Sequence, residues 1–212
     1  MRISLSLFAF SIFQRRVREI LFAAGVTFFA LVLSGCWIPE SFVSNIAVNK
    51  DGSYSFSYDG TLTFGLALAA ASQGGLTPKD EADFAGQAVK LRQEPGFKRV
   101  DYQGKGRYKV LFEKTGKPGE PLYFVDQSVA IVAVLPGKNH TIVIKSFAPR
   151  AEDIQQLSSI GAKIDGTLTV SVANGVKVVK QNAESAPTFG LFGSYKWQIK
   201  SPQAAPMIVL QT

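Results

Sequence analysis

The chain of 212 residues contains one cysteine, Cys36, and one histidine, His140, the side chains that most often serve as nucleophile, base or zinc ligand. A single cysteine excludes a disulfide within the chain and a zinc site built from several cysteines. His140 follows Lys138 and Asn139 in a turn-like stretch, and the sequence offers it no second catalytic partner. We therefore expect no metal site. Because the sequence offers Cys36 no catalytic partner, the role of this thiol has to be inferred from the residues next to it in the sequence.

Three carboxylates, Asp80, Glu81 and Asp83, are close enough in sequence to act as acid–base partners or metal ligands. They follow Thr77-Pro78, which is typical of a helix that starts with a capping side chain and a proline. Carboxylates in the first turn of a helix stabilise its dipole, and we favour this role over a catalytic one. No nucleotide-binding, zinc-protease or serine-hydrolase motif occurs in a supporting context. We predict that the protein is not an enzyme and uses no cofactor.

The densest positive charge falls between residues 98 and 117. Alternation along a strand would place several of these side chains on one face of a sheet. The candidates for contact with an anionic surface are Lys98, Arg99, Lys105, Arg107 and Lys109. Such a patch would attract anionic lipid headgroups or glycolipids over about 8–10 Å, the Debye length near physiological salt. The alternative, which we favour, is an ordinary solvated face whose lysines protect a sheet edge.

Cys36 lies where a long apolar run ends. Three arginines between positions 15 and 18 precede fourteen apolar residues, Ile20 to Leu33, and the small pair Ser34-Gly35 follows them. A basic region, a short apolar region and a small-residue cleavage site form a secretory signal peptide in this order. The apolar run is shorter than the roughly 20 residues that a spanning helix needs. The alternative is an uncleaved signal anchor that ends in a cysteine by chance.

Leu33-Ser34-Gly35-Cys36 resembles the lipobox of bacterial lipoproteins at all four positions. The resemblance implies cleavage between Gly35 and Cys36, a diacylglyceryl group on the Cys36 thiol, and acylation of the new amino group, for example with palmitate. Two or three acyl chains anchor a protein stably, because each buried methylene contributes about 0.8 kcal/mol. The family pattern also implies a cell-envelope location. Trp37, in place of aspartate, favours the outer membrane if the bacterium has one, and otherwise the outer face of the cell membrane.

The composition does not support a nucleic-acid-binding protein. Four of the 23 basic residues and one of the 16 acidic residues precede Cys36, so the net charge after cleavage is +4 instead of +7. An exported protein of this modest charge has no reason to meet nucleic acid. The content of 46% apolar and 18% charged residues is normal for a folded domain.

Period-two alternation predicts strands over 42–48 and 53–58, joined by the turn 49–52, with a bulge at Asp59-Gly60 before 61–64 continues the second strand. The other predicted elements are helices over 66–73, 77–94 and 149–160, hairpins 97–113, 128–147 and 167–181, a loop over 114–121, and a closing strand over 195–200.

This order predicts an α+β fold with largely antiparallel sheets built from hairpins, two main helices and one short helix, as a single domain behind an N-terminal signal helix. The predicted parts are a signal peptide at 1–35, a lipidated tether at 36–44, the α+β domain at 45–200 and a flexible tail at 201–212.

The N-K-D-G-S-Y-S-F stretch at 49–56, the Asn182-Ala183 pair and Trp197 in the closing strand resemble envelope lipoproteins of the LppM-like group. The resemblance is spread over residues 40–200 and implies a non-enzymatic envelope role, with lipid or glycolipid as a candidate ligand. We predict a binding or scaffolding domain whose partners are the membrane, through diacylglyceryl-cysteine, and a lipid or an envelope protein. The alternatives are an interaction module of an envelope protein complex and, least favoured, a hydrolase. We expect Trp197 to be a core residue.

Overall fold

The computed structural model describes residues 37–125, 131–146, 155, 157–187, 193–200 and 205–212. The chain divides into two units, Met1–Cys36 and Trp37–Thr212. The predicted signal peptide at 1–35 and Cys36 lie outside the described residues, so the structure described below is that of the second unit. Most of the helix predicted over 149–160 also lies outside them; within it, Gln155 and Leu157–Ser159 are helical.

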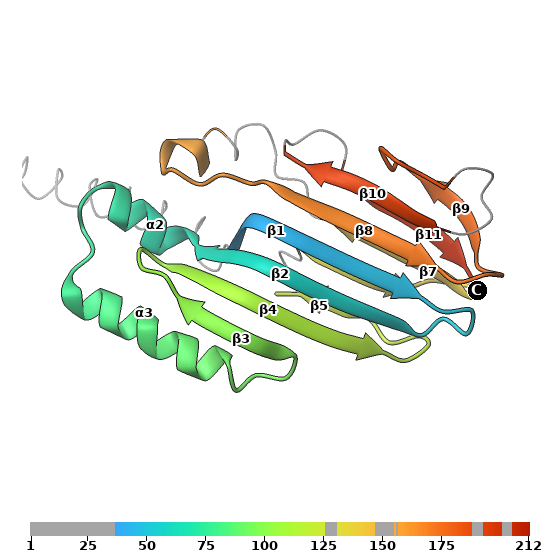
Figure 1. Ribbon diagram of the computed structural model, residues 1–212, viewed down its shortest axis with the longest axis horizontal. Coiled ribbons are helices and arrows are strands. Elements are labelled where there is room, and N and C mark those ends of the chain that lie inside the picture. The colour runs from blue at the N-terminus through green and yellow to red at the C-terminus, as the bar shows by residue number, and fades with distance from the viewer. Residues whose placement is uncertain (1–36, 126–130, 147–154, 156, 188–192, 201–204) are drawn as a thin grey trace, which may run out of the picture. The chain divides into compact units, whose positions relative to one another are not determined.

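A six-stranded sheet, sheet A, forms one layer (Figure 1). Its strand order is β10-β8-β1-β2-β4-β3. The strands are β1 (Trp37–Val48), β2 (Tyr54–Phe64), β3 (Phe97–Tyr102), β4 (Arg107–Gly116), β8 (Gly166–Val172) and β10 (Gly193–Ile199). β1 and β8 are parallel, and the other neighbouring pairs are antiparallel.

A five-stranded antiparallel sheet, sheet B, forms the second layer, with the order β5-β6-β7-β11-β9. Its strands are β5 (Leu122–Phe124), β6 (Val132–Pro136), β7 (Thr141–Ser146), β9 (Lys177–Gln181) and β11 (Met207–Gln211). We call the face of sheet A that points away from sheet B its outer face.

Two helices between β2 and β3 are described as whole elements, α2 (Gly65–Ser72) and α3 (Pro78–Leu91). α3 starts as predicted: the Thr77 hydroxyl accepts from the Asp80 amide while the Asp80 carboxylate accepts from the Thr77 amide. The side of α3 that carries Phe84, Ala88 and Leu91 packs against the core. Both helices confirm the elements expected there.

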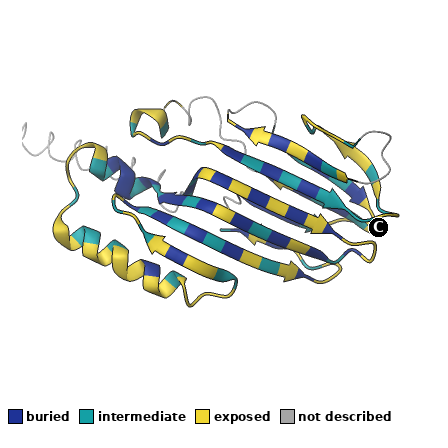
Figure 2. Ribbon diagram, in the orientation of Figure 1, coloured by how far each residue is buried: buried dark blue, intermediate teal, exposed yellow. Residues whose placement is uncertain are grey.

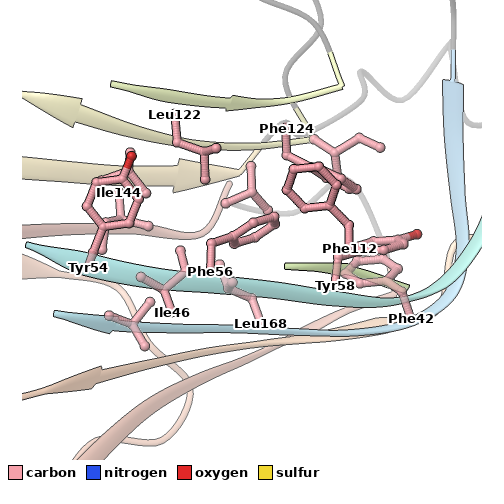
Figure 3. Close-up of a cluster of buried hydrophobic side chains, with 14 of the residues drawn as sticks. Phe42, Ile46, Tyr54, Phe56, Tyr58, Phe112, Leu122, Phe124, Ile144 and Leu168 are labelled. Carbon is pink, nitrogen blue, oxygen red and sulfur yellow. The ribbon is translucent and has the colours of Figure 1, made fainter. Parts of the chain in front are cut away.

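Aromatic side chains, mostly from sheet A, pack with aliphatic side chains between the two sheets. Along β2 up to Leu62, and along β1 from Phe42 onward, buried and more exposed residues alternate, and every second side chain there enters this space (Figure 2). Phe124 of sheet B contacts three rings of sheet A (Figure 3). Its ring centroid lies 5.1 Å from Phe56, 4.6 Å from Tyr58 and 5.0 Å from Phe112. The sheets therefore interlock through their aromatic residues as a β-sandwich.

A β-bulge interrupts β1 near its start. Glu40 pairs with Thr61 and Val43 with Asp59, so Ser41 and Phe42 together lie opposite Gly60. The bulge occurs at the predicted level, but the extra residue belongs to β1 and not to the strand that contains Asp59-Gly60. A Cβ at Gly60 would collide with Phe42, so glycine is required opposite the bulge.

The predicted α+β class is wrong. The structure is a β-rich sandwich of six and five strands, and the two helices described as whole elements contain only 8 and 14 residues. The predicted hairpins over 42–58, 97–113 and the described part of 128–147 are confirmed. The predicted loop over 114–121 is shortened, since β4 continues to Gly116.

The hairpin predicted over 167–181 does not form. β8 pairs with β1 and β10 in sheet A, whereas β9 pairs with β11 in sheet B. The link Ala173–Val176 therefore joins the two layers. The same strand-turn-strand pattern suits a hairpin and such a link equally well, and only the partners available in the folded chain decide between them.

The flexible tail predicted at 201–212 contains β11, which lies between β7 and β9 inside sheet B. Ile208 and Leu210 are fully buried. A run of four apolar residues that follows two prolines gives too little periodicity to be recognised as a strand. The prediction for this segment is wrong for residues 207–211.

The tether predicted at 36–44 is also replaced by structure, because β1 begins at Trp37. Pro39 favoured an irregular segment in the sequence analysis. In the structure, the first four residues of β1 pair with β2 alone, and pairing with β8 begins at Phe42. A proline is tolerated in such a half-edge segment, where one side of the strand lacks a partner. The folded domain thus starts directly after Cys36 instead of at residue 45.

Replacing Phe124 by alanine should lower the free energy of unfolding of residues 37–212 by about 3–5 kcal/mol, because it removes a buried ring that contacts three others. The matched control is Tyr123→Ala, the exposed neighbour on the same strand, which should change it by about 0.5 kcal/mol or less. Urea unfolding followed by tryptophan fluorescence measures both. Equal losses in the two variants would show that Phe124 does not hold the sheets together.

Candidate functional site

The junction between Cys36 and the sandwich is the first candidate site. Cys36 lies outside the described residues, but Trp37 follows it directly and pairs with Phe64. The Trp37 ring lies 5.7 Å from Phe64 and 5.5 Å from Tyr108, centroid to centroid. The residue next to the proposed lipid acceptor is therefore already part of an aromatic cluster.

Glu40, three residues further, is a buried carboxylate that joins four segments. It is 7% exposed and accepts from Arg107 Nε at 2.8 Å and from the Lys163 amide at 3.1 Å. The buried Thr63 hydroxyl donates to the same carboxylate. Arg107 also donates to the Gly161 carbonyl at 3.4 Å. This Glu40 cluster ties together β1, β2, β4 and the segment before β8.

The bulge explains why a charged residue can be buried there. Glu40 pairs with Thr61 on the outer face of sheet A, whereas Phe42, beyond the bulge, enters the core. Strict alternation from Phe42 back to Glu40 would direct the carboxylate between the sheets. The bulge reverses that phase and brings Glu40 within reach of Arg107.

The electrostatics of the Glu40 cluster favour a structural role. Burial alone would raise the pKa of Glu40, but hydrogen bonds from Arg107, Thr63 and the Lys163 amide, together with the charge of Arg107, outweigh it. The pKa therefore lies below its usual value, and the carboxylate is ionised at neutral pH. A fully bonded carboxylate of this kind is not poised to donate a proton, so the cluster fastens the start of β1 in place.

A second polar group connects α3 to the β3–β4 turn. Glu81 accepts from the Tyr102 hydroxyl and from the Lys105 amide, the latter at 3.2 Å. The Gly106 amide donates to the Tyr102 hydroxyl oxygen at 3.2 Å. Burial and then the bond to Glu81 raise the pKa of Tyr102 to about 12. Of the three carboxylates considered above, Asp80 is thus a helix cap and Glu81 a tertiary contact.

Two of the five predicted surface cations, Arg99 and Lys109, lie on the outer face of sheet A beside acidic residues. Asp59 lies 3.0 Å from Lys109 Nζ and 3.5 Å from Arg99, and Asp101 lies 3.6 Å from Arg99. Exposed pairs of this kind contribute only about 0–1 kcal/mol each. They nevertheless reduce the positive potential that the sequence suggested for this region.

The other three predicted cations lie elsewhere. Arg107 is part of the Glu40 cluster, and Lys105 is exposed in the β3–β4 turn. Lys98 lines a shallow depression together with Glu113. The five residues are therefore distributed over separate surroundings, and their contact with an anionic surface stays a prediction. Sequence alternation could not reveal this, because it specifies a face but not the carboxylates that neighbouring strands bring to it.

A shallow depression of about 600 Å³ crosses the outer face of sheet A over β1, β2, β4 and the start of β8. Its walls include Asn45, Ser57, Asp59, Lys109 and Thr167. Amide, hydroxyl, carboxylate and ammonium groups thus meet on an open surface, which suits a ligand rich in hydroxyl groups. We call this surface the outer-face depression.

Trp197, considered above as a ligand contact, is a core residue as expected, with 3% exposure. Its Nε1 donates to Asn182 Oδ1 at 3.0 Å, and the Met207 amide donates to the same oxygen at 2.8 Å. Asn182 follows β9 of sheet B and Trp197 belongs to β10 of sheet A. The asparagine and tryptophan noted in the sequence therefore connect the two layers.

His140 is exposed in the β6–β7 turn, where its carbonyl accepts from the Thr212 amide at 3.0 Å. Within the described ranges, no group of three or more His, Cys, Asp or Glu side chains could hold a metal ion. In the same part of the chain, the helices are all too short or too polar to cross a bilayer.

Glu40→Gln should lower the free energy of unfolding at pH 7 by about 1.5–3 kcal/mol, because the charged partner of Arg107 is lost. The folded pKa of Glu40 is depressed, so its contribution is complete above the unfolded value of about 4.3 and disappears as the pH falls through the lower folded value. The difference between wild type and variant should therefore shrink toward pH 3.

Urea unfolding of residues 37–212 at a series of pH values measures this difference. Glu113→Gln, at an exposed position on β4, is the matched control and should change stability by about 0.5 kcal/mol or less. A difference for Glu40→Gln that is as large at pH 3 as at pH 7 would exclude ionisation of Glu40 as its cause.

Comparisons with known proteins assign no family to this chain. No family model matches the sequence, and no curated protein matches it. Among solved structures, the chain is similar to the folded domain of LppM from Mycobacterium tuberculosis, determined by NMR, with a TM-score of 0.38 and 14% sequence identity. The similarity covers 82% of this chain and 91% of that one. A likeness at this TM-score assigns neither a fold family nor a function.

Proposed function

We propose that the protein is a lipid-anchored lipoprotein of the bacterial cell envelope, and that its β-sandwich binds or scaffolds envelope components without catalysing a reaction. The observation that carries this proposal is the Leu33-Ser34-Gly35-Cys36 sequence behind a basic and apolar leader. The start of β1 at Trp37 supports it, because the folded domain begins one residue after the implied cleavage site.

Two features favour binding over catalysis. The buried or partly buried carboxylates Glu40 and Glu81 are occupied by contacts between elements. Phe124 and its three ring contacts occupy the space between β5 and the β2–β4 part of sheet A, so a ligand at that part of sheet A would have to lie on its outer face. We propose the outer-face depression as the place where the polar headgroup of a lipid or glycolipid rests against sheet A.

The alternative, an interaction module of an envelope protein complex, would be favoured by a contiguous exposed apolar patch. The exposed large apolar side chains of the described part are Val43, Val89, Tyr123 and Val179. They belong to β1, α3, β5 and β9 and are spread over four elements. No specific observation therefore favours this second function.

In a bacterial host, wild-type protein should incorporate labelled palmitate, and its intact mass should lack residues 1–35 and include a diacylglyceryl group. Cys36→Ser should incorporate no label because the thiol acceptor is absent. The matched control is Cys36→Ser combined with Lys50→Cys, which keeps one cysteine but moves it to the exposed β1–β2 turn. It should also stay unlabelled. An unmodified thiol in the wild-type protein would refute the anchor.

The proposed ligand class is tested by solvent extraction of purified residues 37–212 and mass spectrometry, followed by titration with the recovered lipid. Lys109→Gln should weaken binding roughly tenfold, the effect of losing about 1.4 kcal/mol in one charge-assisted hydrogen bond. Lys177→Gln, on the exposed edge strand β9, is the control and should leave affinity unchanged. Recovery of no lipid, or equal affinities in both variants, would contradict this ligand site.

A further inference from the structure

The connection between the proposed anchor and the folded domain is one peptide bond long. Trp37 is the first residue of β1, and the Cα atoms of Cys36 and Trp37 are about 3.8 Å apart, as in any trans peptide. A flexible linker of about 20 residues would instead separate the two by roughly 25 Å on average. A lipid on Cys36 would therefore restrain the domain directly.

The start of β1 is also held firmly and is not a strand end that can detach to act as a tether. Ile38 is 1% exposed, and the Trp37 ring packs on Phe64 and Tyr108. Two residues later, Glu40 is bonded to Arg107 and to the Lys163 amide. Releasing these residues would expose apolar surface and leave a buried ion pair broken.

Several segments meet at this end of the sandwich. The Phe64 amide donates to the Gly106 carbonyl at 2.8 Å, which places the β3–β4 turn beside Trp37. The bond from the Lys163 amide to Glu40 places residues 161–165 there as well. Figure 1 shows the start of β1, the end of β2 and the β3–β4 turn at the same end. We call it the β1-start end.

The opposite end of β1 leads into the Asn49–Ser53 turn. A Cβ at Gly52 in this turn would lie 3.3 Å from Thr212 Oγ1, so the chain terminus lies there too. β1 has 12 residues, which span about 40 Å at 3.3 Å per residue.

From this geometry we infer that the β1-start end rests on the surface of the bilayer that holds the acyl chains, with β1 leading away from it. The inference depends on the proposed lipid anchor at Cys36. Lys105 and Lys163, both exposed at this end, then lie at the level of the headgroup phosphates. Asp165 is exposed at the same end, so the short covalent connection and not net charge fixes the orientation.

This orientation would define the position of the outer-face depression relative to the membrane surface. It lies on the side of the sheet, where Lys109 is level with Glu40 in the strand register and Asp59 is two residues farther along β2. A ligand bound there would lie beside the domain and close to the membrane surface. The Asn49–Ser53 turn would be the part farthest from the bilayer.

The test uses the full chain, processed and lipidated in a bacterial host and reconstituted in phosphatidylcholine–phosphatidylglycerol vesicles that contain a nitroxide-labelled lipid. Single variants Lys105→Cys, Lys163→Cys and Lys50→Cys each carry a fluorophore on the new thiol. Cys36 has no free thiol once it is a thioether, so the introduced cysteine is labelled alone. We expect loss of fluorescence at positions 105 and 163 and none at position 50.

A matched set carries a 20-residue Gly/Ser insertion between Cys36 and Trp37, and there the three positions should be quenched alike. Equal quenching in the direct-fusion set, with the lipid mass present on Cys36, overturns the inference but leaves the anchor standing. A difference that survives the insertion overturns it as well, because the short connection would not be its cause. Absence of the lipid mass removes the anchor and the inference together.

Discussion

The extra residue in β1 opposite Gly60 is the constraint on which the functional end of this protein depends. It reverses the side-chain phase of β1, so Phe42 enters the core while Glu40 lies on the outer face. Only in that phase can Glu40 meet Arg107 from β4 and the amide of Lys163. Without the bulge the strand would have to bury an unpaired carboxylate in the apolar space between the two sheets, at a cost of several kcal/mol. Local backbone geometry thus decides whether the first residues of the domain can be ordered.

An ordered start matters because of where it occurs. β1 is an interior strand, paired with β2 on one side and with β8 on the other, and its inner face contributes to the aromatic core. Residue 37 is therefore connected directly to the middle of sheet A and not to a peripheral strand. β1 pairs with β8, and β8 pairs with β10. Trp197 of β10 donates to Asn182, which follows β9, so this path reaches the second layer. These contacts connect the first residues of β1 to both sheets.

Much of the local structure could be predicted from the sequence, whereas the assembly could not. Alternation and capping signals located β1, β2 and α3 well, because period two and a Thr-Pro-x-Asp start are local properties. Three things depend on partners that a sequence pattern does not name. The link between β8 and β9 joins two sheets instead of forming a hairpin. β11 is a short apolar run that becomes a strand because it lies between β7 and β9. Arg107 and Lys109 have different surroundings because Arg107 pairs with the buried Glu40 and Lys109 with the exposed Asp59. The predicted fold class was wrong for the same reason. Short strands of the second sheet, such as β11, look like loops or tails in the sequence because their pairing partners are not apparent there.

The aromatic cluster around Phe124 and the ordered start of β1 together restrict what this domain could do if it carries the proposed anchor. Carriers that enclose an apolar ligand need a cavity between their layers, but between β5 and the β2–β4 part of sheet A that space is occupied by Phe124 and the three rings that contact it. A domain on a long tether can search for distant partners, whereas a domain joined by one peptide bond to the proposed lipid anchor would stay close to the membrane. With the proposed anchor, the function that fits best is recognition at the surface of the same bilayer, on the side of sheet A where Asn45, Ser57 and Lys109 line the outer-face depression. With the proposed anchor, the short connection and the packing around Phe124 therefore favour a fixed binding surface at the membrane over a shuttle that carries lipid away from it.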